Sequence, residues 1–361
     1  MTRVLIYGAT GFTGRAISHE AKQAGLDFVV AGRNHERLME LAEDVDVPFI
    51  TVRLDDAVGL DQALNDVEVV MNVAGPFVDT AQPVLEACLR TRTHYLDVSG
   101  ERASFARALQ YDGCARERGV MILPGVGFVN TPSDCLAAHL KKRMPDANEL
   151  RFAFSRVDLV SRGTMRAMLS LVRRDVCIRR HGELVAIPVG RLERCFDFGE
   201  GLQMAAALSW ADVITAYHTT GIPNIEAYAE MSVPVRGAYQ LGALWAEPLR
   251  LLPARWASDL ALKAWPEGPD MTARQGKRRV IVAEVENLGR WKMTSRISLP
   301  DGYSITPPIA IRALQKVTSG ELKPGFATPA KVFGADFITD FDGVRIEDVI
   351  RGSLDNFRWQ W

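Results

Sequence analysis

The sequence lacks a strong charge of either sign and lacks clustered metal-binding side chains. Its 43 basic and 44 acidic residues give a formal net charge of −1, which removes any global electrostatic case for nucleic-acid binding. The six histidines include no pair at the spacing of metal ligands. We therefore expect neither a nucleic-acid partner nor a bound metal.

Cysteine is also scarce, and no two cysteines form a C-x-x-C pair. This pattern predicts buried, reduced thiols in a cytoplasmic protein. At the N-terminus, a short strand and glycines follow Arg3 in place of a long apolar region, which argues against a signal peptide. The widely separated cysteines are Cys88, Cys114, Cys135, Cys177 and Cys195.

Long apolar runs are missing as well. The segment 237–265 is rich in Leu, Ala and Trp, but charged residues and prolines interrupt it. It cannot form an uninterrupted bilayer span of ~20 residues. We expect its apolar side chains to cover a core, a dimer partner or an apolar substrate. The 361 residues are enough for two domains with substantial cores.

Glycine is concentrated where the chain begins. Gly8, Gly11 and Gly14 follow the apolar, β-prone run Val4–Tyr7, and helical spacing of alanines then continues until Gly25. A strand, a glycine-rich turn and a helix in this order cradle a dinucleotide pyrophosphate, because glycine permits a tight turn and close backbone approach. The alternative is that the glycines merely shape a tight turn. The predicted cofactor-binding residues of this loop are Gly8, Ala9, Thr10, Gly11, Phe12, Thr13 and Gly14.

A second predicted strand, 27–33, completes the start of a βαβ unit and ends at Arg33. An NAD-selecting site places an acidic residue here, whereas a planar cation suits the 2′-phosphate of NADP(H). NADP(H) is therefore the favoured cofactor, with Arg33 and Asn34 as predicted contacts. The alternative is that Arg33 is a solvated loop residue. Asp55 is a candidate adenine contact or, equally, the cap of the helix that begins near Val58.

Strands and helices go on alternating through the first third, which predicts a Rossmann-like, doubly wound parallel α/β sheet. Ligands collect beyond the carboxyl ends of such strands. The segments 72–77, 99–101 and 124–128 should therefore line one crevice. Within it, the predicted nicotinamide-ribose loop comprises Asn72, Ala74, Gly75, Pro76 and Phe77.

Candidate catalytic residues follow the fifth predicted strand. Alternation places Tyr95, Asp97 and Ser99 on one face, with Glu101 just beyond the strand end. Ser99 and Glu101 are thus the catalytic candidates whose positions best fit the crevice. Glu101 has an alternative role as the N-terminal charge of the helix that follows it.

The remaining pattern predicts an α+β substrate or dimerisation domain over 129–330, after a Rossmann domain over 1–128. A segment over 331–361 is expected to pack back on the Rossmann domain. The elements predicted are a strand near 149–159, a helix near 163–175 and an antiparallel hairpin over 277–299. Candidate acid groups and carboxylate anchors in this domain are Tyr217, His218, Arg166, Arg173, Arg174 and Arg179.

Taken together, the motifs resemble the saccharopine dehydrogenase-like reductases, including the trans-acting enoyl reductases. The resemblance is carried by YGATGFTGR, VVAGRN, VVMNVAGPF, HYLDVSGE and PGVGFVNTPSD, and later by GPDMTARQGKRR, DGYSITPPIAIRAL and GFATPAKVFGADFI. It implies an NADP(H)-binding Rossmann domain, a substrate domain and hydride transfer to a C=C or C=N bond. One departure is Val129, where the family usually has an aspartate that the substrate site could use.

Three function classes stay open. An enoyl reductase would add hydride to the β-carbon of an unsaturated acyl chain and stabilise the developing enolate. An imine reductase or saccharopine-type dehydrogenase would need cationic anchors for amino-acid carboxylates. The third class is a non-catalytic NADP-binding protein. The favoured hypothesis is a homodimeric, cytoplasmic NADPH-dependent reductase of a lipid- or polyketide-like enoyl substrate, either free or bound to a carrier protein.

Overall fold

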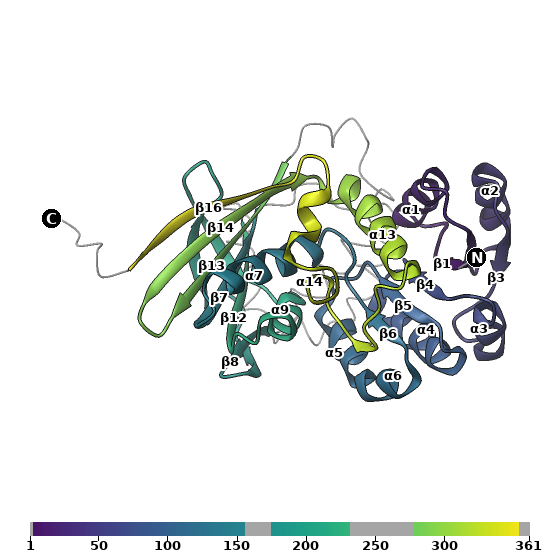
Figure 1. Ribbon diagram of the computed structural model, residues 1–361, viewed down its shortest axis with the longest axis horizontal. Coiled ribbons are helices and arrows are strands. Elements are labelled where there is room, and N and C mark those ends of the chain that lie inside the picture. The colour runs from purple at the N-terminus through teal and green to yellow at the C-terminus, as the bar shows by residue number, and fades with distance from the viewer. Residues whose placement is uncertain (1–2, 156–174, 232–277, 354–361) are drawn as a thin grey trace, which may run out of the picture. The chain divides into compact units, whose positions relative to one another are not determined.

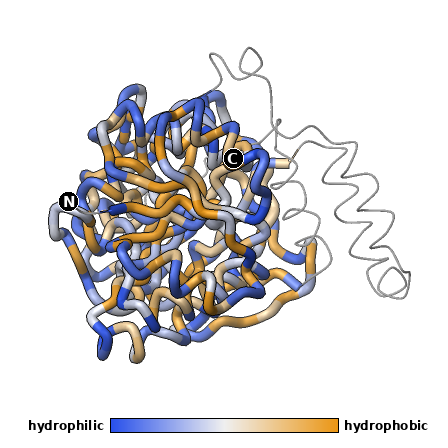
Figure 2. Tube along the Cα trace, turned by 90° about the vertical axis from the view of Figure 1, so that its right-hand side faces the viewer, coloured by the Kyte–Doolittle hydropathy of each residue, from blue (hydrophilic) through white to orange (hydrophobic). Residues whose placement is uncertain are grey.

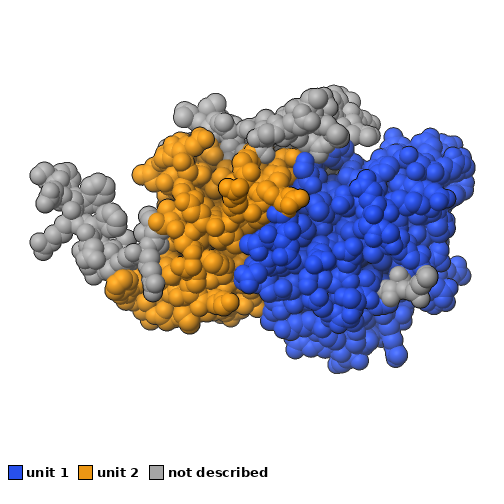
Figure 3. Space-filling view, turned by 45° about the horizontal axis from the view of Figure 1, so that its top comes forward, with its two compact units in different colours: residues 1–132, 302–341 blue, residues 133–301, 342–361 orange. Residues whose placement is uncertain are grey.

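The fold is taken from a computed structural model, which describes residues 3–155, 175–231 and 278–353. The chain forms two compact units, each built from two stretches of sequence (Figure 3). Unit 1 comprises residues 1–132 and 302–341, and unit 2 comprises residues 133–301 and 342–361.

Unit 1 contains a seven-stranded parallel sheet in the order β15-β6-β5-β4-β1-β2-β3 (Figure 1). The strands are buried, apolar runs, as in sheets covered on both faces. This arrangement confirms the predicted doubly wound parallel fold. The strands are β1 (Val4–Tyr7), β2 (Phe28–Gly32), β3 (Phe49–Thr51), β4 (Val69–Asn72), β5 (His94–Asp97), β6 (Met121–Leu123) and β15 (Gly325–Phe326).

Helices connect these strands and bury one apolar stripe each. In the first helix, Ile17 and Ala21 lie one turn apart and are both fully buried. Figure 2 shows that apolar stretches of the chain are concentrated in the interior and polar stretches in the peripheral loops. The helices between the first six strands are α1 (Phe12–Gln23), α2 (His35–Val45), α3 (Ala57–Leu64), α4 (Phe77–Thr91), α5 (Arg102–Gln110) and α6 (Asp112–Arg118).

The chain returns to unit 1 after residue 301. Helix α13 (Gly302–Thr318) packs against α1, and β15 adds to the sheet edge by parallel pairing of Gly325 with Met121. A short helix α14 (Pro329–Phe333) and a 3-10 helix (Ala335–Asp340) complete the unit. The boundaries therefore differ from those predicted: 129–132 and 302–330 belong to unit 1, and within 331–361 only 331–341 does. A two-residue strand is too short to leave a pattern in the sequence.

Unit 2 contains a nine-stranded mixed sheet, which confirms a second domain built on a sheet. The predicted hairpin is present, with Ile281 of β13 paired to Ile297 of β14. Helices α7 (Thr131–Arg143) and α9 (Asp212–Thr220) accompany the sheet. The strands are β7 (Ala147–Phe154), β8 (Val176–Arg180), β9 (Glu183–Ile187), β10 (Glu193–Asp197), β11 (Leu202–Ala207), β12 (Asn224–Glu230), β13 (Arg278–Asn287), β14 (Trp291–Pro300) and β16 (Arg345–Ser353).

Several sequence predictions lie outside the described residues, namely the helix near 163–175 up to residue 174 and the apolar segment 237–265. Within the described ranges, no helix combines the length and apolarity needed to cross a bilayer. All five cysteines are thiols. The predicted burial holds for Cys88, Cys135 and Cys177, but Cys195 is exposed because its side chain lies on the outer face of β10.

Candidate functional site

Two of the three motif glycines are required by the fold itself. Gly8 has a φ of +86°, and a Cβ atom there would lie 2.7 Å from the backbone of Ala74. A Cβ atom at Gly14 would lie 2.4 Å from the carbonyl oxygen of Gly8. These glycines let the first loop, the helix α1 and the loop after β4 approach one another closely.

Gly11 is different, because no described residue of unit 1 demands a glycine there. Its φ is −74°, and a Cβ atom would lie 3.4 Å from its nearest neighbour, the oxygen of Gly8. Gly11 is exposed at the N-cap of α1, where backbone N–H groups and the positive end of the helix dipole attract phosphate. A ligand that needs close backbone approach explains this glycine. The residues present thus fit a dinucleotide pyrophosphate.

The loops after β1, β2 and β3 meet at one edge of the sheet. Tyr7, at the end of β1, is buried and donates its hydroxyl proton to the carbonyl oxygen of Val52, 3.2 Å away. Arg33 follows β2 directly and is exposed, with no ion pair in the described part of the chain. The side chain of Asn34 accepts a hydrogen bond from the backbone N–H of Arg37 (3.0 Å) and so caps α2. Of this pair, Arg33 is the side chain available to a ligand.

Asp55 does not cap the following helix. Asp56 does so by accepting a bond from the backbone N–H of Gly59 (2.8 Å). Asp55 instead accepts two bonds from the guanidinium of Arg53, at 2.9 and 2.7 Å, which lowers the pKa of the Asp55 carboxyl. Sequence reasoning missed Arg53. The signal that could have found it is an arginine near the end of the third strand, comparable to Arg33 at the end of the second; the observed β3 (Phe49–Thr51) ends two residues before Arg53.

The loop after β4 is held from within. Asn72 is fully buried, accepts a bond from the N–H of Ala74 (3.1 Å) and donates one to the hydroxyl of Tyr95 (3.2 Å). Thr80 of α4 donates its hydroxyl proton to the carbonyl oxygen of Ala74. The Gly75–Pro76 bond is cis, and Phe77 begins α4. The loop predicted to contact the nicotinamide ribose is therefore rigidly placed beside Gly8.

A buried hydrogen-bond chain runs along one face of β5. Tyr95 donates to Asp97 (2.8 Å), and the other oxygen of Asp97 accepts from the hydroxyl of Ser99 (2.7 Å) and the N–H of Gly125 (2.9 Å). This confirms the predicted alternation of Tyr95, Asp97 and Ser99. Burial raises the pKa of the Asp97 carboxyl, while its donors oppose the shift. Asp97 thereby ties the loop after β5 to the loop after β6.

Glu101 binds a different helix from the one expected. It stands at the N-cap position of α5 without capping that helix, and its two oxygens accept from the N–H groups of Phe77 (3.1 Å) and Val78 (3.0 Å). Glu101 therefore neutralises the N-terminus of α4. Burial raises the pKa of its carboxyl, and the two amide bonds oppose the shift.

The third loop of the predicted crevice joins the same assembly. A Cβ atom at Gly100 would lie 2.4 Å from the side chain of Val129, so these two loops touch. The N–H of Phe128 donates to the hydroxyl of Thr306 in α13 (3.1 Å). The structure thus brings together the loops after β4, β5 and β6, as predicted. Val129 provides an apolar contact where an aspartate would place a charge.

The candidates in unit 2 are engaged in packing. Arg179 is buried, donates to the carbonyl oxygen of Val213 (2.7 Å) and covers the ring of Tyr217 at 4.0 Å. His218 meets the Tyr217 ring edge-on. Arg166, Arg173 and Arg174 lie outside the described residues. Arg179 is therefore not a free anchor for a substrate carboxylate.

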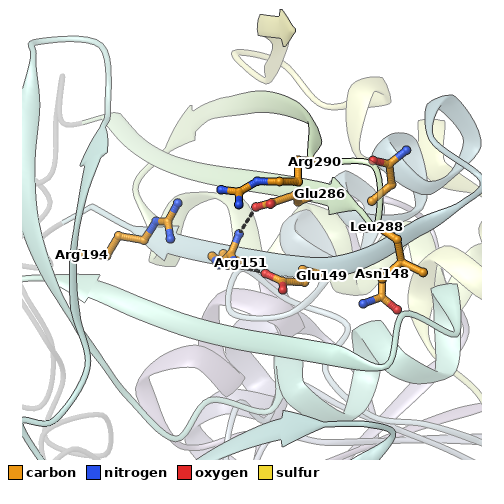
Figure 4. A pocket seen from close by; sticks show the side chains of 8 residues that line it. Asn148, Glu149, Arg151, Arg194, Glu286, Leu288 and Arg290 are labelled. Carbon is orange, nitrogen blue, oxygen red and sulfur yellow. Dashed lines mark hydrogen bonds and ion pairs between the residues drawn. The ribbon is translucent and has the colours of Figure 1, made fainter. Parts of the chain in front are cut away.

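Unit 2 also carries a polar pocket of about 450 Å³ on one face of its sheet (Figure 4). Its central cation, Arg151, pairs with Glu149, with Glu286 at 3.2 Å and with Glu226 at 3.5 Å. Arg194 pairs with Glu284 at 3.3 Å. Since its charges largely neutralise one another, the pocket is an ion-pair network. The full lining is Asn148, Glu149, Arg151, Arg194, Glu286, Asn287, Leu288 and Arg290.

A parallel sheet in the order 3-2-1-4-5-6, a phosphate loop at its first turn and a cation after its second strand define a dinucleotide-binding unit. Residues 4–123 match the model of the saccharopine dehydrogenase NADP binding domain. This match confirms the predicted cofactor, NADP(H), and the resemblance seen in the motifs.

Curated relatives match a little over a third of the chain. A saccharopine dehydrogenase-like oxidoreductase of Bos taurus is 28% identical over 162 residues, which are 39% of this chain and 38% of the relative. A lipid droplet localized protein of Caenorhabditis elegans is 30% identical over 153 residues, 38% and 36% of the two chains. A trans-acting enoyl reductase of Mycobacterium ulcerans is 26% identical over 148 residues, 39% and 35%. The match thus spans well under half the length of these relatives.

One solved structure matches almost the whole chain. Saccharopine dehydrogenase (L-Glu forming) from Saccharomyces cerevisiae superposes with a TM-score of 0.64 over 97% of this chain and 100% of that one, at 12% identity. At this identity the likeness shows the fold. It confirms the combination of a Rossmann unit with a second, mixed-sheet unit.

Proposed function

We propose that the chain is an NADPH-dependent reductase that reduces the C=C bond of an enoyl substrate with a lipid- or polyketide-like acyl chain. The observation that carries the cofactor half is Gly11, because the packing of the described residues does not require a glycine at this position. The similarity to a trans-acting enoyl reductase supports the substrate half. Homodimerisation, carriage of the substrate on a carrier protein and a cytoplasmic location are parts of the proposal that rest on the sequence.

NADPH would be held by the glycine loop and Arg33, and when bound it supplies a hydride. The loops after β4, β5 and β6 would then surround the reacting end of the cofactor. Reduction places negative charge on the acyl carbonyl, so a donor or ordered water must reach the enolate and the α-carbon. We expect the acyl chain to lie in a mainly apolar pocket.

We propose positioning roles for Ser99 and Glu101 in this reaction. The hydroxyl proton of Ser99 is donated to Asp97, and both oxygens of Glu101 accept backbone N–H groups. These contacts favour holding the crevice loops over moving a proton. Asn72, Ala74, Gly75, Pro76 and Phe77 would shape the surface against which the nicotinamide ribose lies.

The C=N alternative needs cationic anchors for a substrate carboxylate. Arg179 does not serve, since its guanidinium binds backbone carbonyls and covers Tyr217. A non-catalytic NADP-binding protein is the other alternative, and turnover separates it from both reductases. The similarity to a trans-acting enoyl reductase is what supports the enoyl reductase over these alternatives.

The deciding experiment follows NADPH consumption with a long-chain enoyl thioester and with a cyclic imino acid at matched concentrations. We expect faster turnover of the enoyl thioester. Faster turnover of the imino acid would contradict the proposal, as would NADPH binding without turnover of either compound. Gly11→Val should abolish the turnover, and turnover that survives in a folded Gly11→Val variant would contradict the assignment of the phosphate loop.

A further inference from the structure

The two exposed arginines of unit 1 that follow β2 and β3 are held side by side by the backbone. Gly32 and Thr51 are ladder partners, and the N–H of Val52 donates to the carbonyl oxygen of Gly32 (2.9 Å). Tyr7 donates to the carbonyl oxygen of Val52 from the other side. Arg33 directly follows Gly32 and Arg53 directly follows Val52. Their common edge is therefore set by the register of the sheet.

Burial raises the pKa of the Tyr7 phenol, and three charged residues near the end of β1 also affect it. The guanidinium groups of Arg33 and Arg53 and the carboxylate of Asp55 all act electrostatically on this phenol. The end of β1 thus marks one small region with two cations and one anion. Arg33 is where a 2′-phosphate is expected, so Arg53 lies close to the same group.

Asp55 partly neutralises Arg53, but weakly. The guanidinium and the carboxylate make two hydrogen bonds, with side chains 69% and 67% exposed. Exposed ion pairs of this kind contribute little and rearrange readily. A phosphate monoester carries more charge than a carboxylate and accepts bidentate bonds from arginine. It is therefore the stronger partner for Arg53.

We propose that Arg53 is a second ligand of the NADPH 2′-phosphate beside Arg33, and that Asp55 moderates the affinity by competing with the phosphate for Arg53. The inference rests on the NADPH dependence in the proposed function and adds a determinant to it. It also gives Asp55 a role distinct from adenine contact. Removal of Arg53 should weaken NADPH, and removal of the Asp55 charge should tighten it.

The test is equilibrium binding of NADPH, NADH, 2′,5′-ADP and 5′-AMP to the full chain and its variants. Arg53→Ala should weaken NADPH and 2′,5′-ADP about tenfold or more, as for loss of a charge-assisted hydrogen bond. It should leave NADH and 5′-AMP within about twofold. Asp55→Asn should tighten NADPH and 2′,5′-ADP about threefold and leave the other two unchanged.

The chain offers a matched control pair. Arg90 and Asp61 form the same exposed bidentate contact in unit 1, at 2.8 to 3.0 Å between α4 and α3. Arg90→Ala and Asp61→Asn should not change the affinity of any of the four ligands. Circular dichroism and thermal unfolding establish that each variant is folded.

The outcomes separate the inference from the proposed function. Equal losses of NADPH and NADH in Arg53→Ala, or no loss, would overturn the role of Arg53. Weaker NADPH binding by Asp55→Asn would overturn the competition and restore Asp55 as a direct cofactor contact. Wild-type chain that binds NADPH no better than NADH would instead contradict the cofactor choice itself.

Discussion

Unit 1 and unit 2 both carry arginines on an edge or face of a sheet, but these arginines are paired differently. Arg151 of unit 2 is mostly buried and pairs with carboxylates from β7, β12 and β13. Arg33 of unit 1 is exposed and has no ion pair within the described ranges. Removing one member of a buried ion pair destabilises a fold, because it leaves the other charge buried without a partner. An exposed cation at a strand end can instead bind a ligand.

Glycines show the same contrast within unit 1. Gly8 and Gly14 are explained by contacts with the chain's own backbone. Gly11 has a common backbone conformation and room for a side chain. A residue whose type its own fold does not explain is therefore the better marker of a binding site.

The largest expected effect is on cofactor binding by Gly11→Val. The branched side chain fills the space that the pyrophosphate needs, so we expect no measurable NADPH binding by a folded protein. Gly113→Val is the matched control, because Gly113 in α6 also has open space around its Cβ position. If both variants bind NADPH like the wild type, the phosphate loop is misassigned. Fluorescence titration with NADPH measures the difference.

The next largest effect is on the free energy of unfolding when Arg151 is replaced. Arg151→Ala leaves Glu226, which is only 7% exposed, with one cation fewer, and should cost about 3 kcal/mol. NADPH affinity should not change. Arg290→Ala, an exposed residue of the same pocket, should cost about 0.5 kcal/mol or less. Denaturant unfolding provides both values, and equal costs for the two variants would show that the network is not stabilising.

Arg33→Ala should have a smaller effect than these two variants, and the effect should be on the preference for NADPH over NADH. Loss of a charge-assisted contact should cost NADPH about 1.5 to 3 kcal/mol of binding free energy and NADH much less. Titration with both cofactors measures this difference. Equal losses would mean that Arg33 does not select between them.

Asp212 differs from the ion-paired carboxylates of unit 2. Burial, together with the nearby Asp134, raises the pKa of its carboxyl to about 7. The folded state then binds a proton that the unfolded state has already released above about pH 4. Stability contributed by this group is therefore present at low pH and is lost as the pH rises from about 4 to about 7. The expected slope is about 1.4 kcal/mol for each pH unit.

Asp212→Asn removes this titration and should flatten the pH dependence of unfolding between pH 5 and pH 7. Asp146→Asn, which changes an exposed carboxylate bound to Asn287, should leave the slope intact. Urea unfolding at several pH values compares the three proteins. A wild-type slope that persists in Asp212→Asn would place the titrating group elsewhere.

The pattern of residues along the sequence predicts those parts of the structure that depend on residues close together in the sequence. The strand ends at Tyr7 and Asn72, the glycine loop and the shared face of Tyr95, Asp97 and Ser99 all follow from spacing. Contacts between loops do not. Glu101 stands at the start of α5 but binds the start of α4, a choice that depends on how two loops pack. For the same reason, the return of residues 302–341 to unit 1 has no local signal.

The central claim is that unit 1 selects NADPH through its available cations. Isothermal titration of the full wild-type chain with NADPH and with NADH, in the same buffer at low ionic strength, tests it most directly. The account predicts NADPH binding at least about tenfold tighter than NADH, with a preference that shrinks as salt is added. Equal affinities, or a preference for NADH, would contradict it.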